Sequence, residues 1–261
     1  MVPRKAVLPM ILQRMTWAGV VVRTPQTAVA IDPLYNVDVG FFGEPRQPFF
    51  TLDVFGRVDA VLVTHLHSDH FDPKAIADFY GADVAVHVPA ASVETAQSQA
   101  LTNVIGVFPG DAFVVGDLEI TATFSADGLG DPQLAWVVGR GDKRIIHCGD
   151  TLWHGHWWKI ARAHGPFDIA CLPINAAVIH DPTMLPSGEP ICLSPEQAVS
   201  ASIVLGAERI VPIHFGDFHN PPIYNHTPEA IERLTAAAAK RSVDVKVLAS
   251  AEWLEIETST R

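Results

Sequence analysis

The sequence predicts a single α/β domain that spans residues 1–261. Short apolar runs that are typical of strands alternate with two well-marked helix starts, Asp72-Pro73 and Ser194-Pro195. Hydrophobic residues make up 48% of the chain and charged residues only 18%, which suits a protein with a sizeable core and no long disordered tail. No linker-like composition or charge run divides the chain, so we expect one folding unit.

The chain opens with a predicted hairpin, which a long aromatic loop follows. Residues 19–23 and 28–31 are apolar runs on either side of turn-forming residues. Asp32 comes next, before a proline, and its carboxylate either orients a metal-binding histidine or caps the turn. Residues 34–57 carry five phenylalanines and two prolines. We expect this loop to be either a flap over a site or an oligomer contact.

A dense group of potential metal ligands follows the apolar run at residues 58–63. His65, His67, Asp69 and His70 fall within six residues at the end of a predicted strand. Neutral imidazole nitrogens and carboxylate oxygens are ligands of Zn²⁺, Mn²⁺ and Fe²⁺. The alternation of His65 and His67 lets both face one metal ion. Asp69 and His70 lie past the turn and can face a second ion.

This His-x-His-x-Asp-His pattern resembles the signature of the metallo-β-lactamase-fold superfamily. The resemblance implies a four-layer αββα sandwich with a site for one or two metal ions at one edge. The Ile-Asp-Pro, Gly-Asp-Thr and Pro-Ile-His runs at 31–33, 149–151 and 212–214 are similar to those of its ascorbate-phosphate-lactonase-like and N-acylphosphatidylethanolamine-phospholipase-D-like branch. Many members of the lactonase-like group carry Gly-His-Ala-Ser in the first strand, whereas this chain has Ala-Gly-Val-Val at 18–21.

The chain departs from the family at one expected ligand. In the family a histidine ends the strand that corresponds to residues 118–124, but Ser125 stands at that position. Asp127 lies two residues later. It either replaces the missing histidine as an oxygen ligand or caps the turn at Gly128. A third outcome is a first metal position that is weak or empty.

Two later motifs complete the candidate metal site. A predicted hairpin at 133–138 and 143–148 leads to Asp150, and the resemblance implies that Asp150 bridges two metal ions. A short strand at 209–213 leads to His214, which the resemblance implies as the last ligand of the second ion. The predicted ligands are His65, His67, Asp69, His70, Asp150 and His214, with Asp127 as the alternative seventh.

Three further residues are candidate substrate contacts. Trp153 begins an aromatic run at 153–158 that either lines an apolar pocket or packs on a sheet as a helix face. His180 lies in the loop at 175–192, which borders the site in this branch of the family. His219 lies in a loop rich in proline and asparagine and could rim the same pocket.

The remaining elements follow from local signals. Aspartate or serine before proline is typical of a helix start, and glycine of a helix end. Residues 104–108, 112–115 and 118–124 are expected to form one meander, and the last two strands are expected to close the second sheet. The other expected elements are helices at 72–80, 195–205 and from 227–229 to 240, and strands at 83–87, 168–173, 245–248 and 252–256.

Charge and cysteine content exclude several classes of protein. The formal charge of −11 disfavours a nucleic-acid partner or an anionic membrane surface, because both require clustered basic residues. The three cysteines are scattered and form no CxxC motif, which is typical of reduced thiols in a cytoplasmic protein. Residues 1–15 lack the features of a signal peptide, and no apolar run is long enough to span a membrane.

These observations predict a metal-dependent hydrolase. We expect two divalent ions, with zinc the first choice and manganese or iron as alternatives, and Asp69 and Asp150 as the catalytic carboxylates. The predicted reaction is attack by a metal-bound hydroxide on a small ester, lactone or phosphodiester. The alternatives are a phospholipase- or phosphodiesterase-like enzyme that acts on a larger apolar substrate, and a degenerate member that only binds a ligand. A homo-oligomer is compatible with the sequence.

Overall fold

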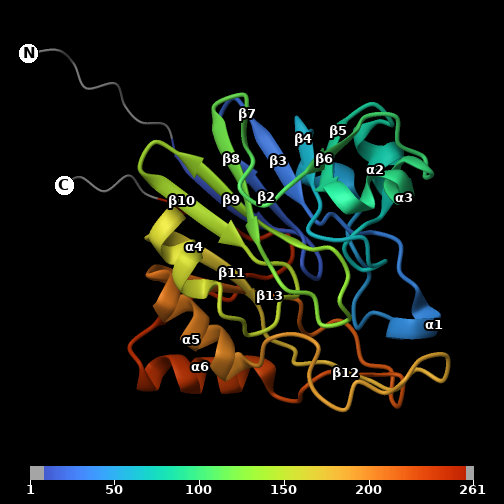
Figure 1. Cartoon of the computed structure of the whole chain (residues 1–261), viewed down its shortest axis with the longest axis vertical. Helices are drawn as coiled ribbons and strands as arrows, with labels where there is room; N and C mark the ends of the chain where they lie inside the picture. Colours follow the sequence, from blue (N-terminus) through green and yellow to red (C-terminus); the bar gives the residue numbers. More distant parts are fainter. Residues whose placement is uncertain (1–8, 257–261) are drawn as a thin grey trace, which may run out of the picture.

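The computed structural model describes residues 9–256, and two seven-stranded sheets form its centre (Figure 1). The expectation about a signal peptide falls largely on residues 1–8, which lie outside this range. In spatial order the first sheet contains β16 (Trp253–Ile256), β1 (Met10–Arg14), β2 (Val20–Arg23), β3 (Ala28–Ile31), β4 (Ala60–Leu62), β5 (Ala85–Pro89) and β6 (Val104–Val107). The second contains β15 (Asp244–Val245), β13 (Ala207–Ile213), β11 (Phe167–Pro173), β10 (Lys143–His147), β9 (Leu134–Arg140), β8 (Leu118–Phe124) and β7 (Ala112–Val115). A small third sheet pairs β12 (Val178–Ile179) with β14 (Tyr224–Asn225).

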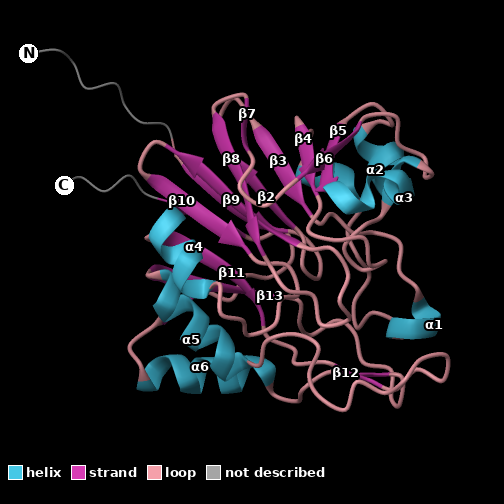
Figure 2. Ribbon diagram, in the orientation of Figure 1, coloured by secondary structure: helices cyan, strands magenta, loops and turns pink. Residues whose placement is uncertain are grey.

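Helices cover the outer face of each large sheet, which gives four layers (Figure 2). The first sheet is covered by α2 (Pro73–Tyr80) and α3 (Val93–Gln97), and the second by α4 (Trp157–His164), α5 (Pro195–Leu205) and α6 (Ala230–Lys240). The short helix α1 (Val39–Phe42) and the 3-10 turns η1 (Leu52–Phe55) and η2 (Ala90–Ser92) lie in the loops. The predicted αββα sandwich is confirmed.

Burial on both faces explains why the strands read as continuous apolar runs. In β2, Val20 and Val22 belong to the core between the two sheets, while Val21 belongs to the core under α2. Successive side chains of a strand point to opposite faces of the sheet. A sheet that lies between two layers therefore needs apolar residues at every position of the strand, and not only at alternate ones. The central core also holds Trp136 of β9 and Val211 of β13. The sheets are therefore joined by a shared apolar layer.

The direction of the strands brings the candidate ligands to one edge. The strands β3, β4, β5 and β6 are parallel to one another. In the second sheet β10, β11 and β13 are parallel, and β8 runs in the same direction because it is antiparallel to β9. The residues that follow β4, β8, β10 and β13 are those that the sequence singled out as ligands. The carboxyl ends of parallel strands are the usual location of sites in α/β proteins.

The predicted meander over residues 104–124 is wrong. The strand β6 pairs in parallel with β5 in the first sheet, whereas β7 and β8 form a hairpin in the second. The turn at Pro109-Gly110-Asp111 therefore carries the chain from one sheet to the other. There the Gly110 amide donates to the Ala122 carbonyl of β8 at 2.8 Å. Local sequence shows where these strands lie but not which neighbour each one pairs with.

Two expectations at the end of the chain are also corrected. The strand β16 pairs antiparallel with β1 and so closes the first sheet, while only β15 lies at the edge of the second. The strand β1 was not predicted, because residues before Met15 read as an apolar patch broken by prolines. The last helix begins at Ala230 because Glu229 adopts a left-handed conformation with φ of 52°. The expected start at 227–229 therefore lies just before the helix.

Two helix starts are confirmed in detail. Asp72 caps α2 through its Oδ1, which accepts the Ala75 amide at 2.9 Å. Ser194 and Gln197 form a reciprocal capping box at the start of α5, and Gly206 ends that helix in a left-handed conformation. Within residues 9–256, none of the helices has the length and apolar character that a membrane crossing requires.

Candidate metal centre

The predicted ligands gather in two groups where the strand ends of both sheets meet. One group comprises His65, His67, Asp127 and Asp150. The other comprises Asp69, His70 and His214. In each group one nitrogen or oxygen atom per residue lies within 4.8 Å of the others, which is the spacing that ligands around a common ion require. Apart from His67, which is partly exposed, every member is buried.

The first group is built around the Nε2 atom of His65. This atom lies 2.9 Å from Nδ1 of His67 and 3.6 Å from Oδ2 of Asp150. The Nδ1 atom of His67 is in turn 3.7 Å from Oδ1 of Asp127. The other nitrogen of His67, Nε2, lies 2.8 Å from the carboxylate of Asp131, which holds the ring. His65 and His67 thus present different nitrogens to the same point.

The second group is built around the Oδ2 atom of Asp69. It accepts a hydrogen bond from the indole Nε1 of Trp17 at 2.9 Å. The Nε2 atoms of His214 and His70 lie 3.2 Å and 3.6 Å from the same oxygen. The rings of His70 and His214 are stacked at 5.0 Å. Asp69 therefore fixes the common point that both imidazoles face.

A hydrogen-bond chain through Asp32 orients a histidine in each group. The Oδ2 atom of Asp32 lies 2.8 Å from Nδ1 of His70 and accepts the Thr64 hydroxyl at 2.6 Å. The Thr64 hydroxyl is also 3.0 Å from Nδ1 of His65. Both imidazoles therefore direct Nε2 toward the centre. Of the two roles that the sequence left open for Asp32, the structure shows the one that orients a histidine.

Sequence reasoning missed four residues that hold the ligands in place. Thr64, Trp17 and Asp131 contact His65, Asp69 and His67 as described above. The fourth is Asn175, whose Oδ1 lies 3.1 Å from Nδ1 of His214. Asn175 follows β11 just as His214 follows β13, so its place after a parallel strand was a usable signal. Trp17 gives no such signal, because only the folded chain brings it to Asp69.

The structure resolves the local geometry at Ser125. The Ser125 hydroxyl donates to the Cys148 carbonyl at 3.0 Å and accepts from Nε2 of Gln133 at 2.8 Å, so both of its roles are used within the second sheet. Asp127 uses Oδ2 to accept the amides of Leu129 and Asp131 at 2.8 and 2.9 Å. Its Oδ1 remains on the side of His67. Asp127 thus caps the turn and still presents one oxygen to the first group.

Burial and mutual charge shift the pKa values of the cluster strongly. Burial lowers the pKa of His65 far below its usual value and that of His214 to about 4, so both are neutral imidazoles at neutral pH. Burial alone also lowers the pKa of His70, but the carboxylates of Asp69 and Asp32 outweigh it and raise that pKa to about 9. Burial raises the pKa of Asp150 to about 7.

Three buried atoms of the cluster indicate that a cation belongs there. Within the described residues, His70 Nε2, Asp127 Oδ1 and Asp150 Oδ1 are buried without a hydrogen-bond partner. Such atoms are rare in folded proteins because each costs the free energy of lost solvation. All three belong to the two groups of candidate ligands. Imidazole nitrogen and carboxylate oxygen are also the donors that divalent transition metals bind, so these residues fit metal ions.

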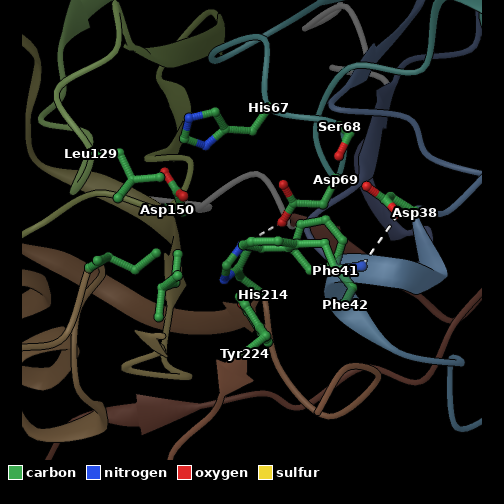
Figure 3. Close-up of a pocket in the computed structure, with 12 residues that line it drawn as sticks. Asp38, Phe41, Phe42, His67, Ser68, Asp69, Leu129, Asp150, His214 and Tyr224 are labelled. Carbon is green, nitrogen blue, oxygen red and sulfur yellow. Dashed lines mark hydrogen bonds and ion pairs between the residues drawn. The ribbon is translucent and has the colours of Figure 1, made fainter. Parts of the chain in front are cut away.

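A cavity of about 220 Å³ opens over the two groups (Figure 3). His67, Asp69, Asp150 and His214 form its polar side. Apolar and aromatic side chains form most of the remaining wall. The complete lining is Asp38, Phe41, Phe42, His67, Ser68, Asp69, Leu129, Asp150, Ile179, Ile191, His214 and Tyr224. A molecule in this cavity would therefore contact the candidate ligands on one side and an apolar surface on the other.

The predicted substrate contacts Trp153, His180 and His219 are not among the described residues that line this cavity. Trp153 is partly exposed beside α4, whose Trp157 packs in the core under the second sheet. Only Trp157 and Trp158 of the run at 153–158 belong to α4, and of these two Trp157 packs in the core while Trp158 is exposed. His180 and His219 are exposed.

Part of the aromatic loop at 34–57 does reach the cavity. Phe41 and Phe42 of α1 line it, and Phe42 packs on Tyr224 with ring centroids 5.1 Å apart. Phe55, by contrast, is buried under the first sheet. The flap interpretation therefore applies to α1, whereas the end of the loop is core.

Comparisons with known proteins agree with this geometry. The family model described as the β-lactamase superfamily domain matches residues 27–215. A UPF0173 metal-dependent hydrolase of Rubrobacter xylanophilus is 31% identical over 218 residues, which cover 78% of this chain and 79% of the relative.

Solved structures share the fold at lower identity. The isothiocyanate hydrolase from Delia radicum gut bacteria is 22% identical, with a TM-score of 0.75 and coverage of 94% of this chain and 98% of that one. The metallo hydrolase Igni18 from Ignicoccus hospitalis is 21% identical, with a TM-score of 0.72 and coverage of 96% and 100%. The chain belongs to the β-lactamase superfamily, among its metal-dependent hydrolases with the metallo-β-lactamase fold.

Proposed function

We propose that this protein hydrolyses a small, uncharged ester or lactone at a centre of two divalent metal ions. The observation that carries the proposal is the convergence of three buried atoms without a hydrogen-bond partner, His70 Nε2, Asp127 Oδ1 and Asp150 Oδ1, beside a cavity with an apolar wall. His65, His67, Asp127 and Asp150 would hold one ion. Asp69, His70 and His214 would hold the other, with Asp150 shared between the two.

The donor set supports zinc as the first choice, with manganese or iron as alternatives, because imidazole and carboxylate suit all three. When bound, such ions supply Lewis acidity, which lowers the pKa of a water molecule and polarises a carbonyl oxygen. Asp127 supports the proposal of a complete site over that of a degenerate, ligand-binding protein. It brings the first group to four potential ligands despite Ser125.

The carboxylates of the chain have distinct tasks in this proposal. Asp69 lines the cavity, and the Trp17 indole holds its Oδ2 by a hydrogen bond of 2.9 Å. Its carboxylate is thus positioned to accept the proton of the attacking water and to pass it to the leaving group. Asp150 would bind with Oδ2 on the side of His65, 3.6 Å from its Nε2, while its Oδ1 has no hydrogen-bond partner and is available to a cation.

The cavity supports the proposed substrate class. A volume of about 220 Å³ is below the range of roughly 300–1,000 Å³ that is usual for drug-sized ligands, so a compact molecule fits best. Beyond the proposed metal ions, its described lining offers no lysine or arginine to a phosphodiester, which favours an uncharged ester or lactone. Phe41, Phe42 and Tyr224 provide the surface for an apolar group of that substrate. The buried state of all three free cysteines supports a cytoplasmic location.

A substrate panel tests the proposal. The chain loaded with Zn²⁺ is assayed with small aryl esters, lactones, a bis-aryl phosphodiester and an aryl isothiocyanate, a small uncharged electrophile suggested by the solved structure of similar fold. We expect turnover of esters or lactones, and its loss in His67→Ala and Asp150→Ala, while the exposed control Asn103→Ala is active. The proposal is wrong if the purified chain retains no metal ion, or if Asp150→Ala turns over as the wild type does.

A further inference from the structure

We propose that Asn175 is a positioning residue for the second metal ion, and that Tyr224 and Cys192 hold its side chain in the orientation this role requires. The inference rests on the proposed metal centre and concerns residues outside the ligand set. Asn175 is fully buried and follows β11 at the edge where the strand ends meet. Its side chain makes three hydrogen bonds, and each of them ends on a different segment of the chain.

The contact with His214 sets which nitrogen of that ring is available. The Oδ1 atom of Asn175 lies 3.1 Å from Nδ1 of His214, and an amide oxygen can only accept a hydrogen bond. The proton of a neutral His214 then sits on Nδ1, and the lone pair of Nε2 points toward Asp69, 3.2 Å away. A hydrogen bond to the second ring nitrogen is how proteins fix both tautomer and ring plane of a metal-binding histidine.

The amide of Asn175 would fail in this role if it were turned end for end, because its Nδ2 would then face His214. Two contacts oppose that rotation. The Nδ2 group donates to the Tyr224 hydroxyl at 2.7 Å, and Oδ1 accepts from the Cys192 thiol at 2.6 Å. Burial raises the pKa of the Cys192 thiol, so the S–H proton is retained for donation. Because sulfur is a weak acceptor, the Cys192 thiol distinguishes the oxygen end of the amide from its nitrogen end, while the Tyr224 hydroxyl, which can donate or accept, holds the other end in place.

Tyr224 links the hydrogen-bond network of the Asn175 side chain to the substrate cavity. Its ring lines the cavity beside Phe42, while its hydroxyl is bound to Asn175. The small third sheet holds Tyr224 in place, since β14 pairs with β12 and brings Ile179 into the same wall. Tyr224 therefore connects the apolar wall to the orientation of His214, and removal of its hydroxyl should weaken metal binding without altering the shape of the cavity.

A metal titration tests the proposal without any assay of turnover. The chain is freed of metal with a chelator and titrated with Zn²⁺ against a chromophoric competitor. We expect two ions to bind the wild type. In Asn175→Ala, the affinity for one of them should fall by roughly 10- to 100-fold, the usual cost of losing such a partner. Asn175→Asp retains an acceptor for the Nδ1 proton and should bind within a few-fold of the wild type.

Tyr224→Phe retains the ring and should show a smaller loss of affinity for the same ion. Its matched control is Tyr80→Phe, because the Tyr80 hydroxyl donates to a backbone carbonyl away from the centre. The control for Asn175→Ala is Asn103→Ala, whose exposed amide donates to the Asp83 carbonyl away from the centre. Both controls should bind two ions with wild-type affinity.

The outcomes separate this inference from the proposed function. A wild-type chain that binds no Zn²⁺ would overturn the metal centre and the inference together. A folded Asn175→Ala chain that binds both ions as tightly as the wild type would overturn the inference alone. If Asn175→Ala does not fold, Tyr224→Phe decides, and unchanged Zn²⁺ affinity in that variant overturns the role of the network.

Discussion

At the scale of single residues, one buried carboxylate contacts both groups of the candidate metal centre. Asp32 accepts the Thr64 amide with Oδ1 at 2.7 Å, and its Oδ2 serves the Thr64 hydroxyl and His70 together. Through Thr64 the same carboxylate reaches His65. The sequence placed Asp32 before a proline and left two roles open. The strand order decided between them, because β3 and β4 are neighbours and end side by side.

We therefore expect Asp32→Asn to weaken metal binding although it preserves size and shape. If its Oδ1 still accepts the Thr64 amide, its new NH₂ group faces His70 Nδ1 and forces the proton of that ring to Nε2. The Zn²⁺ affinity should then fall by roughly 10- to 100-fold in competition with a chelator. Asp59→Asn is the matched control, since Asp59 accepts only the Ala28 amide far from the centre. Equal affinities of Asp32→Asn and the wild type would contradict the assigned role.

At the scale of elements, α1 depends on its surroundings to form at all. It has four residues, fewer than an isolated helix needs to be stable in water. Asp38 caps it by accepting the amides of Gly40 and Phe41 at 3.0 and 3.3 Å. From the other side, the amide of Asn220 donates to the carbonyls of the same two residues at 3.1 and 3.0 Å. These contacts place Phe41 and Phe42 at the cavity.

Asn220→Ala should therefore loosen the aromatic wall and leave the metal centre intact. Loss of two hydrogen bonds should reduce the free energy of unfolding by about 1–2 kcal/mol, as urea denaturation would show. With a substrate identified by the panel, KM should rise by up to about tenfold, equivalent to about 1.4 kcal/mol of binding. Zn²⁺ stoichiometry and kcat should match those of Asn103→Ala, an exposed control. An unchanged KM would show that α1 does not shape the substrate site.

At the scale of the whole molecule, the two sheets concentrate charge at their common edge. Asp32, Asp69 and Asp150 are buried there beside His70. The negative charge of buried carboxylates has to be balanced by positive charge nearby. Without metal ions the chain relies on protons for this purpose, and the raised pKa values of His67 and His70 express that need. Stability and metal content should therefore be linked through pH.

The metal-free chain should lose stability as pH rises from about 6.5 to 9. The pKa of His70 is about 9 in the folded chain against 6.5 for a histidine side chain in the unfolded chain, so its contribution to stability is complete below pH 6.5 and is lost as pH passes 9. The raised pKa of His67 acts in the same direction. The loss should be on the order of 3 kcal/mol in urea denaturation at several pH values.

The Zn²⁺-loaded chain is the control for this pH dependence. Metal binding replaces the proton on the ligand nitrogens, so its free energy of unfolding should not decline over the same window. Removal of the metal with a chelator at pH 7.5 should lower the unfolding midpoint. If the metal-free chain is as stable at pH 9 as at pH 6.5, the assignment of His70 as a charged partner of Asp69 and Asp32 is wrong.

The amino-acid sequence by itself determined the features that depend on neighbouring residues. The cluster from His65 to His70, the helix starts at Asp72 and Ser194 and most strand positions follow from local patterns, because ligand spacing, capping and burial periodicity act over a few residues. The four-layer αββα fold was implied only by the resemblance to a known family. Asp150 and His214 were identified only through motifs similar to those of a known family.

The tertiary structure decided what depends on contacts between distant segments. It placed β6 and β7 in different sheets, paired β16 with β1, and brought Asn175 and Trp17 to the ligands. It also selected Phe41 and Phe42 for the cavity wall in place of the predicted contacts Trp153, His180 and His219. Strand pairing and cavity shape arise from packing across the whole chain, and a local pattern carries no information about which distant surface it will meet.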